Sequence, residues 1–258
     1  MLQTGAALQD LPRGNKAWTP LARALTAAGD RWTLMIVLAL APGRTRLTAL
    51  HRRVPGVSTG VLERHLQHMV ALDLVTRTRF REMPPRVELE LTDAGRELLA
   101  VAGMLARWGM RNHWSPPAER ERIDVGALLR MLPVLLEDRT ELPDGAIVEA
   151  LVESPVEPLR VVFAAEDGEL RLVSVEGEMC GSGPAGERAD ERHDAHADGR
   201  EDAFAGTPRV ALVGDEQAWI AALAPAADYS GLRLEGEQRL AEALFERLPR
   251  EELARLPQ

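Results

Sequence analysis

Cysteine is nearly missing from this chain of 258 residues, in which Cys180 is the single copy. One thiol cannot form an internal disulfide and is too few for a cysteine-based zinc site. Aromatic residues are also scarce, with 4 Phe, 5 Trp and 1 Tyr, so the 45% of hydrophobic residues are mainly aliphatic. The longest apolar run, residues 34–41, is far shorter than the roughly 20 residues that cross a bilayer. The N-terminal segment lacks the basic start and apolar block of a secretory signal, so we expect a cytoplasmic protein without membrane contact.

The motifs of common enzyme chemistry are missing as well. The chain has no glycine-rich phosphate loop, no nucleophile elbow and no carboxylate pair at a spacing suited to acid–base catalysis. His193, His196 and Asp198 could bind a metal ion, but a polar, flexible segment gives no preorganisation. Cys180 has no neighbouring cation to activate its thiol. We therefore expect no enzymatic activity, no cofactor and no metal site.

Net positive charge is confined to the first half of the chain. Residues 1–116 hold 16 Lys and Arg against 9 Asp and Glu, a net charge of +7, whereas residues 117–258 hold 15 against 31, a net charge of −16. A basic half is attracted to nucleic acid and an acidic half is repelled by it, although a charge of +7 also fits an ordinary solvated surface. The change falls at Ser115-Pro116-Pro117, which predicts a linker between two domains, residues 1–115 and 116–258.

The first domain is expected to contain five helices and one hairpin. Three N-cap residues, Asp30, Ser58 and Thr92, mark where helices begin, and Pro-Gly breaks mark where they end. Alternating apolar residues on both sides of a Pro-Pro tip mark the hairpin. The expected helices cover residues 19–28, 31–41, 47–54, 58–72 and 92–112, and the strands cover residues 74–80 and 86–91.

The helix expected at residues 58–72 carries the clearest functional signal. Helical periodicity places Leu62, Leu66 and Met69 on one face, which we expect to be core. Arg64 and Gln67 lie opposite, among small residues. Arginine can bond guanine and glutamine can bond adenine in the DNA major groove, and small residues permit close approach, but on one helix alone a solvated face is the commoner explanation. The residues of this helix expected to contact DNA are Ser58, Thr59, Gly60, Arg64, Gln67 and His68.

The segments around this helix favour DNA binding. A helix that ends at a Pro-Gly turn, followed by a second, capped helix, predicts a helix-turn-helix. The hairpin that follows carries Arg77, Arg79, Arg81 and Arg86 on its strands and tip. Four guanidinium groups on a protruding hairpin suit contacts with phosphates or the minor groove. A helix-turn-helix followed by a basic hairpin is a winged helix.

Three stretches resemble the HxlR-type winged-helix regulators, which are relatives of the MarR group. They are AGDRWTLMIVLAL (residues 28–40), VPGVSTGVLERHLQHMVALDLVTR (residues 54–77) and PPRVELELTDAGREL (residues 84–98). The resemblance implies a dimeric bacterial transcription factor whose subunits join through the first and last helices of the domain. Many members have a redox-sensing Cys where this chain has Thr19, so thiol sensing at that place is excluded. The apolar residues expected at the dimer interface are Leu21, Leu25, Leu98, Leu105 and Trp108.

The second domain is expected to hold a mixed α/β sheet, which makes the whole chain an α+β protein. Apolar alternation and turn residues predict five strands, with one helix before them and two among and after them. The helices cover residues 125–136, 215–223 and 237–248, and the strands cover residues 147–152, 159–165, 170–175, 209–213 and 232–234. Residues 181–206 are almost devoid of apolar groups, which predicts a mobile insertion.

The order of elements in residues 116–258 is similar to that of sterol-carrier-protein-type lipid-binding domains. Two stretches carry this likeness, PRVALVGDEQAWIAALAP (residues 208–225) and SGLRLEGEQRLAEALFERL (residues 230–248). The resemblance implies an apolar tunnel between sheet and helices, whereas a plain packed core explains the same apolar faces equally well. The residues that would line a tunnel are Val161, Phe163, Leu170, Leu172, Val210, Leu212, Trp219, Leu223 and Leu244.

Together these patterns predict a homodimeric transcriptional regulator that binds an operator in double-stranded DNA. Its C-terminal domain is expected to sense or hold an apolar small molecule. In the alternative hypothesis that domain is a ligand-free dimerisation or protein-interaction module. In a third, the protein is a carrier whose winged helix has lost DNA binding.

Overall fold

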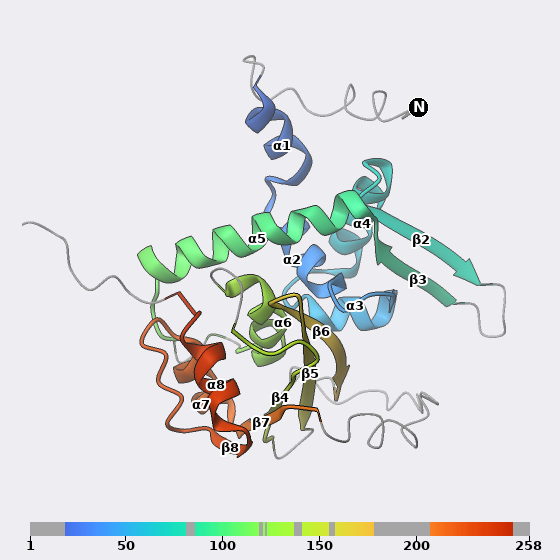
Figure 1. The fold of residues 1–258 in the computed structure, drawn as a ribbon. Helices are drawn as coiled ribbons and strands as arrows, with labels where there is room; N and C mark the ends of the chain where they lie inside the picture. The colour runs from blue at the N-terminus through green and yellow to red at the C-terminus, as the bar shows by residue number, and fades with distance from the viewer. Residues whose placement is uncertain are drawn as a thin grey trace, which may run out of the picture. The chain divides into compact units, whose positions relative to one another are not determined.

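A computed structural model of the chain describes residues 19–80, 86–118, 121, 123–136, 141–154, 158–177 and 207–249. The chain divides into two compact units (Figure 1). The first contains residues 1–114 and 126–135, and the second contains residues 115–125 and 136–258. Among the described residues, no helix is long and apolar enough to span a membrane.

The first unit joins a set of helices to a small sheet. Its elements are α1 (Pro20–Ala28), α2 (Arg31–Leu40), β1 (Thr45–Arg46), α3 (Leu47–Arg53), α4 (Thr59–Ala71), β2 (Val75–Phe80), β3 (Arg86–Leu91), α5 (Asp93–Asn112) and α6 (Val125–Leu135). Helices α3 and α4 form the helix-turn-helix, and the β2–β3 hairpin projects beyond α4 as a wing (Figure 1). The predicted helices and hairpin strands are confirmed to within one residue at each end. Strand β1 was not predicted, because two residues are too few to show a period.

Side-chain caps explain where these helices begin. Asp30 accepts hydrogen bonds from two backbone N–H groups at the start of α2, those of Trp32 and Thr33. Ser58 and Thr92 do the same for one N–H each at the starts of α4 and α5. Each cap satisfies a backbone donor that has no partner inside its helix. The three predicted N-caps are confirmed.

The core of the first unit lies between α2, α3, α4 and the sheet. The sheet has the order β1-β3-β2 with antiparallel pairs, and in the wing Arg77 pairs with Leu89 and Arg79 with Val87. Its buried apolar cluster consists of Ile36, Val37, Ala39, Leu40, Leu50, Val54, Val57, Leu62, Leu66, Met69, Val75, Leu89 and Leu91. Because α4 contributes its whole apolar face to this cluster, its opposite face is held outward.

Helix α6 packs in the first unit although it follows the linker and begins the acidic half of the chain. Gly103 of α5 lies so close to Val134 of α6 that a Cβ at position 103 would overlap the Val134 carbonyl oxygen. Arg107, one turn further along α5, donates a hydrogen bond to the same carbonyl. Helix α6 contains Pro133 and continues two residues beyond it, to Leu135.

The second unit is built on a mixed sheet of five strands in the order β6-β5-β4-β7-β8. Its elements are β4 (Ile147–Val152), β5 (Leu159–Glu166), β6 (Glu169–Glu176), β7 (Arg209–Gly214), α7 (Glu216–Leu223), β8 (Arg233–Gly236) and α8 (Gln238–Phe245). Strand β4 pairs in parallel with β7, and the other neighbours are antiparallel. The predicted strands are confirmed to within two residues at each end, while α8 ends three residues earlier than predicted.

One face of this sheet is a continuous apolar surface. Two rows of residues cross it. The row from β6 to β8 is Val175, Val161, Ala150, Leu212 and Leu234, and the row from β6 to β7 is Leu172, Phe163, Val148 and Val210. Helices α7 and α8 pack on β7, and Trp219 of α7 donates its indole N–H to the Leu151 carbonyl at 3.0 Å. This hydrogen bond lets a fully buried indole satisfy its polar atom.

The opposite face of the same sheet buries a carboxylate. Glu149 is only 4% exposed. It accepts two hydrogen bonds from Arg160, at 3.0 Å from Nε and 2.8 Å from Nη2, and it forms an ion pair with Arg209. The hydrogen bond to Glu149 raises the pKa of Arg160 above its usual value. A buried charge is tolerated when it is paired and hydrogen-bonded in this way.

Candidate nucleic-acid interface

Helix α4 has one buried face and one open face. Leu62, Leu66 and Met69 are fully buried. Arg64 and Gln67, on the other side, are exposed, and neither has a hydrogen bond or ion pair with another described residue. Both side chains are therefore available to donate to groups outside the protein. His68 is half-buried at the edge of this face.

The first turn of α4 leaves its backbone accessible. Ser58, Thr59 and Gly60 are all exposed. The Thr59 hydroxyl lies 3.4 Å from Nε2 of His51 in α3, which joins the two helices of the helix-turn-helix. Nothing lies within 4 Å of the position that a Cβ on Gly60 would take. The first turn therefore has room for the close approach of a nucleic-acid backbone.

Helix α4 is joined to the start of α2 by a polar contact. His65 Nδ1 lies 3.3 Å from Oδ1 of Asp30, the residue that caps α2. Burial alone would raise the pKa of Asp30, but the hydrogen bonds from Thr33 and from the capped N–H groups, with a smaller contribution from the charge of His65, hold that pKa below its usual value. His65 thus packs toward α2 and does not lie on the exposed face with Arg64.

The inner face of the wing carries two arginines in different environments. Arg77 of β2 donates from Nη1 to Oε1 of Glu63 in α4, at 2.5 Å. Arg79, two residues further out on the same face, is exposed and has no ion pair within the described ranges. The sequence predicted that both would contact DNA, and the structure gives Arg77 a partner within the protein.

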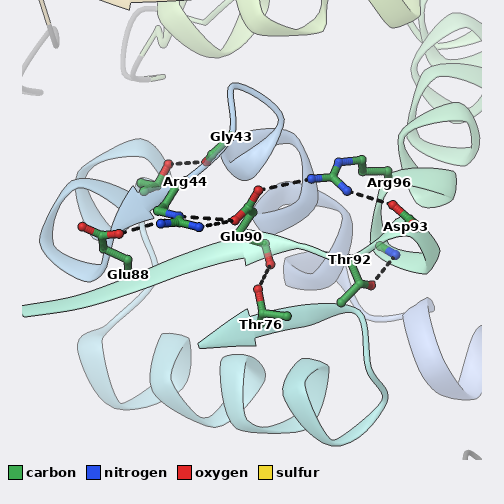
Figure 2. Close-up of polar contacts among 10 residues, drawn as sticks. Gly43, Arg44, Thr76, Glu88, Glu90, Thr92, Asp93 and Arg96 are labelled. Atoms are coloured by element: carbon green, nitrogen blue, oxygen red, sulfur yellow. Dashed lines mark hydrogen bonds and ion pairs between the residues drawn. The ribbon is translucent and has the colours of Figure 1, made fainter. Parts of the chain in front are cut away.

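The outer face of the wing is a ladder of ion pairs, shown in Figure 2. Arg44, in the loop before β1, contacts Glu88 at 3.7 Å and Glu90 at 3.3 Å. Arg96 of α5 joins Glu90 to Asp93 (Figure 2). The Thr76 hydroxyl donates to the Glu90 carbonyl. These contacts fix the base of the wing on the side away from α4.

Arg86 lies at the outer end of this ladder. Its guanidinium carbon is 4.5 Å from the centre of the Phe80 ring, and its Nε is 3.3 Å from Glu88. Its side chain is thus held along the strand near the wing tip. Arg81, also predicted to contact DNA, lies in residues 81–85, outside the described residues.

The acidic partners of the wing were not singled out from the sequence. Glu63, Glu88 and Glu90 each pair with an arginine across a helix–strand or strand–loop contact. Glu88 and Glu90 alternate with apolar residues of β3, which is the signal that places them together on one face. No sequence pattern linked Glu63 to Arg77, because these residues meet only when β2 packs beside α4.

A second surface of the first unit is apolar and exposed. Among the predicted interface residues, Leu21 is 67% exposed and Leu25, Leu105 and Trp108 are exposed by more than half, while Leu98 packs partly on the core. None of the nine residues of α1 is buried. The structure adds Val101 and Met104, which are exposed on the same side of α5 as Leu105 and Trp108. Exposed apolar stripes of this kind mark interaction surfaces.

The predicted ligand-lining residues of the second unit lie together on one side of its sheet. Val161, Phe163, Val210, Leu212, Trp219 and Leu244 are fully buried, Leu170 and Leu223 are nearly so, and Leu172 is half-buried. Most of them therefore border no space that a water molecule can enter. The described residues contain no group of three or more His, Cys, Asp or Glu that could hold a metal ion. Cys180, His193, His196 and the predicted insertion at 181–206 lie outside the described residues.

A helix-turn-helix with an open polar face on its second helix and a β-hairpin wing defines a DNA-binding transcriptional regulator. The HxlR-like helix-turn-helix family matches residues 27–116 of this chain. An HTH-type transcriptional regulator of Bacillus subtilis strain 168, YtcD, is 33% identical over 89 residues, which are 34% of this chain and 70% of the relative. The chain belongs to the HxlR-like family.

Other relatives match the same part of the chain. An HTH-type regulator of Halalkalibacterium halodurans is 32% identical over 36% of this chain and 84% of its own. One from Methanothermobacter thermautotrophicus is 30% identical over 33% of this chain and 66% of its own length, just under two thirds. The solved structure of reduced YodB from B. subtilis, a transcriptional regulator, is 24% identical, with a TM-score of 0.35, over 39% of this chain and 100% of that one. The family match does not extend to residues after 116.

Proposed function

We propose that the protein binds a specific operator in double-stranded DNA by inserting α4 into the major groove. The observation that carries the proposal is the open face of α4, where Arg64 and Gln67 are exposed above a fully buried apolar face. Arg64 and Gln67 would bond base edges, with Ser58, Thr59, Gly60 and His68 beside them. Arg79, Arg81 and Arg86 of the wing would contact phosphates or the minor groove.

Alanine at position 64 is expected to remove specificity without removing DNA binding. Loss of a bidentate contact with guanine should reduce the binding free energy by about 1–3 kcal/mol on the cognate site and change it little on random DNA. The cognate site is first selected from a random duplex pool with the wild-type protein, and both affinities are then measured by fluorescence anisotropy. Arg79→Ala is the matched control. It should weaken binding to both DNAs and reduce the slope of log affinity against log salt by about one unit. Wild-type affinity of Arg64→Ala for the cognate DNA would refute the role of α4 in recognition.

We also propose that the protein acts as a homodimer joined through α1 and α5. One winged helix covers a half-site, and a two-fold dimer places two recognition helices about one turn of DNA apart. A second copy would cover the stripe formed by Leu21, Leu25, Val101, Met104, Leu105 and Trp108, most of which is more than half exposed in the single chain.

For the second unit the packing favours an interaction module with a closed core. Phe163 and Leu212 on its apolar sheet face are fully buried and border no preformed space. The other candidate, an apolar small-molecule sensor, is supported by the unbroken apolar face between the sheet and helices α7 and α8. A ligand there would have to separate the helices from the sheet. It would regulate DNA binding only if it bound two arrangements of the protein with different affinity.

Native mass spectrometry of the purified full-length protein tests the dimer and the ligand together. We expect a dimer in the wild type and a monomer in Leu105→Glu, because a charge on each copy would be buried at the two-fold contact. Val173→Glu, at an exposed apolar residue of β6, is the control and should leave the dimer intact. A dimeric Leu105→Glu protein contradicts the proposed interface. A co-purified apolar molecule in the spectrum supports the sensor, and a spectrum without one supports the interaction module.

A further inference from the structure

We propose that Glu63 and Arg77 form a brace that sets the angle between the wing and the recognition helix α4. In this proposal, which rests on the proposed function, Arg77 is a positioning residue and not a phosphate contact. The ion pair between the two side chains and the burial of the Arg77 guanidinium carry the inference.

The surroundings of Arg77 differ from those expected of an arginine that contacts DNA. It lies on the inner face of β2, opposite the fully buried Leu89 of β3. Its side chain is only 18% exposed, with Nη1 bonded to Glu63. Its Nε is buried and has no hydrogen-bond partner among the described residues. A guanidinium held at this depth reaches a phosphate only after the ion pair has broken.

The position of the brace explains what it controls. At the base of the wing, Thr92 bonds the carbonyls of Leu74 and Asp73 through its N–H and its hydroxyl. Those bonds fix the point at which the hairpin leaves the unit. The brace acts further along β2 and connects the strand directly to α4, so it limits the tilt of the hairpin relative to that helix. With α4 in the major groove, this tilt decides where Arg79 meets the DNA backbone.

The charge of Glu63 gives the brace a second effect. Glu63 is placed on the side of α4, where an unpaired carboxylate would repel the phosphates that flank the major groove. Arg77 neutralises that carboxylate within the protein. The two roles of Arg77 then make opposite predictions for Glu63→Gln. If Arg77 is a phosphate contact, the substitution releases it and tightens DNA binding, whereas loss of the brace weakens binding.

The experiment uses the full-length protein and the DNA that the wild type selects from a random duplex pool. We expect Glu63→Gln and Arg77→Gln each to weaken cognate binding by about 5- to 30-fold, which corresponds to about 1–2 kcal/mol of binding free energy. Glu63→Gln should leave the slope of log affinity against log salt unchanged, because it removes no phosphate contact. Arg79→Gln is the control and should reduce that slope by about one unit. The exchanged pair, Glu63→Arg with Arg77→Glu, should recover part of the lost affinity.

A second measurement does not need DNA. Loss of the brace should accelerate hydrogen exchange in β2 and β3 in Glu63→Gln and Arg77→Gln, compared with Arg79→Gln. Tighter DNA binding by Glu63→Gln, or unchanged hydrogen exchange in both variants, would overturn the proposal. If the wild type selects no DNA sequence, the proposed function fails, while hydrogen exchange still decides whether the ion pair holds the wing.

Discussion

Alanine in place of Trp219 is expected to destabilise the second unit by about 3–5 kcal/mol, the usual cost of truncating a buried tryptophan. Trp219 is fully buried, and its indole N–H bonds the carbonyl of Leu151 in the central strand β4. The substitution leaves a large cavity and removes the hydrogen bond between the indole and β4. Urea denaturation followed by circular dichroism should show an early transition for the second unit and an unchanged one for the first.

Gln217→Ala is the matched control, because Gln217 is exposed on the same helix and should change stability by less than about 0.5 kcal/mol. At urea concentrations below the first transition, we expect Trp219→Ala to keep its affinity for cognate DNA, because the core behind α4 belongs to the first unit alone. A single, shifted transition for the whole chain would contradict the independence of the two units. Lost DNA affinity would show that recognition depends on the second unit.

Alanine substitutions at Gly103 and Gly109 are expected to have opposite effects although both lie on α5. A Cβ at position 103 overlaps the Val134 backbone, so α6 has to move, at a cost of about 1–3 kcal/mol. At position 109 nothing lies within 4 Å of the new Cβ, and alanine should stabilise the helix by up to about 1 kcal/mol. Thermal or urea unfolding of the two variants measures the difference.

The Gly103 substitution also tests how α6 is held. Moving α6 breaks the hydrogen bond from Arg107 to the Val134 carbonyl, so amide exchange along α6 should accelerate in Gly103→Ala and not in Gly109→Ala. Equal stabilities, or equal exchange in α6, would show that the close contact at Gly103 does not hold this helix on α5.

The sequence determined the local structure and the open face of α4. Asp30, Ser58 and Thr92 each mark a helix start because an N-cap acts within three residues and needs no distant partner. The buried and exposed faces of α4 follow from helical periodicity in the same way. The family resemblance was equally visible, because its motifs are contiguous stretches of residues 27–116. Local interactions leave a local pattern, and that pattern is enough to predict them.

The tertiary structure decided which distant segments meet. The pairing of β4 with β7 in parallel, the packing of α6 on α5 at Gly103, and the ion pair between Glu63 and Arg77 each join residues that no local pattern connects. An arginine on a strand looks the same in sequence whether it faces a carboxylate or solvent, so Arg77 and Arg79 could not be distinguished before the fold was known. Their difference arises because α4 packs beside the base of β2 and ends short of its tip, which brings a carboxylate to one arginine and leaves the other exposed.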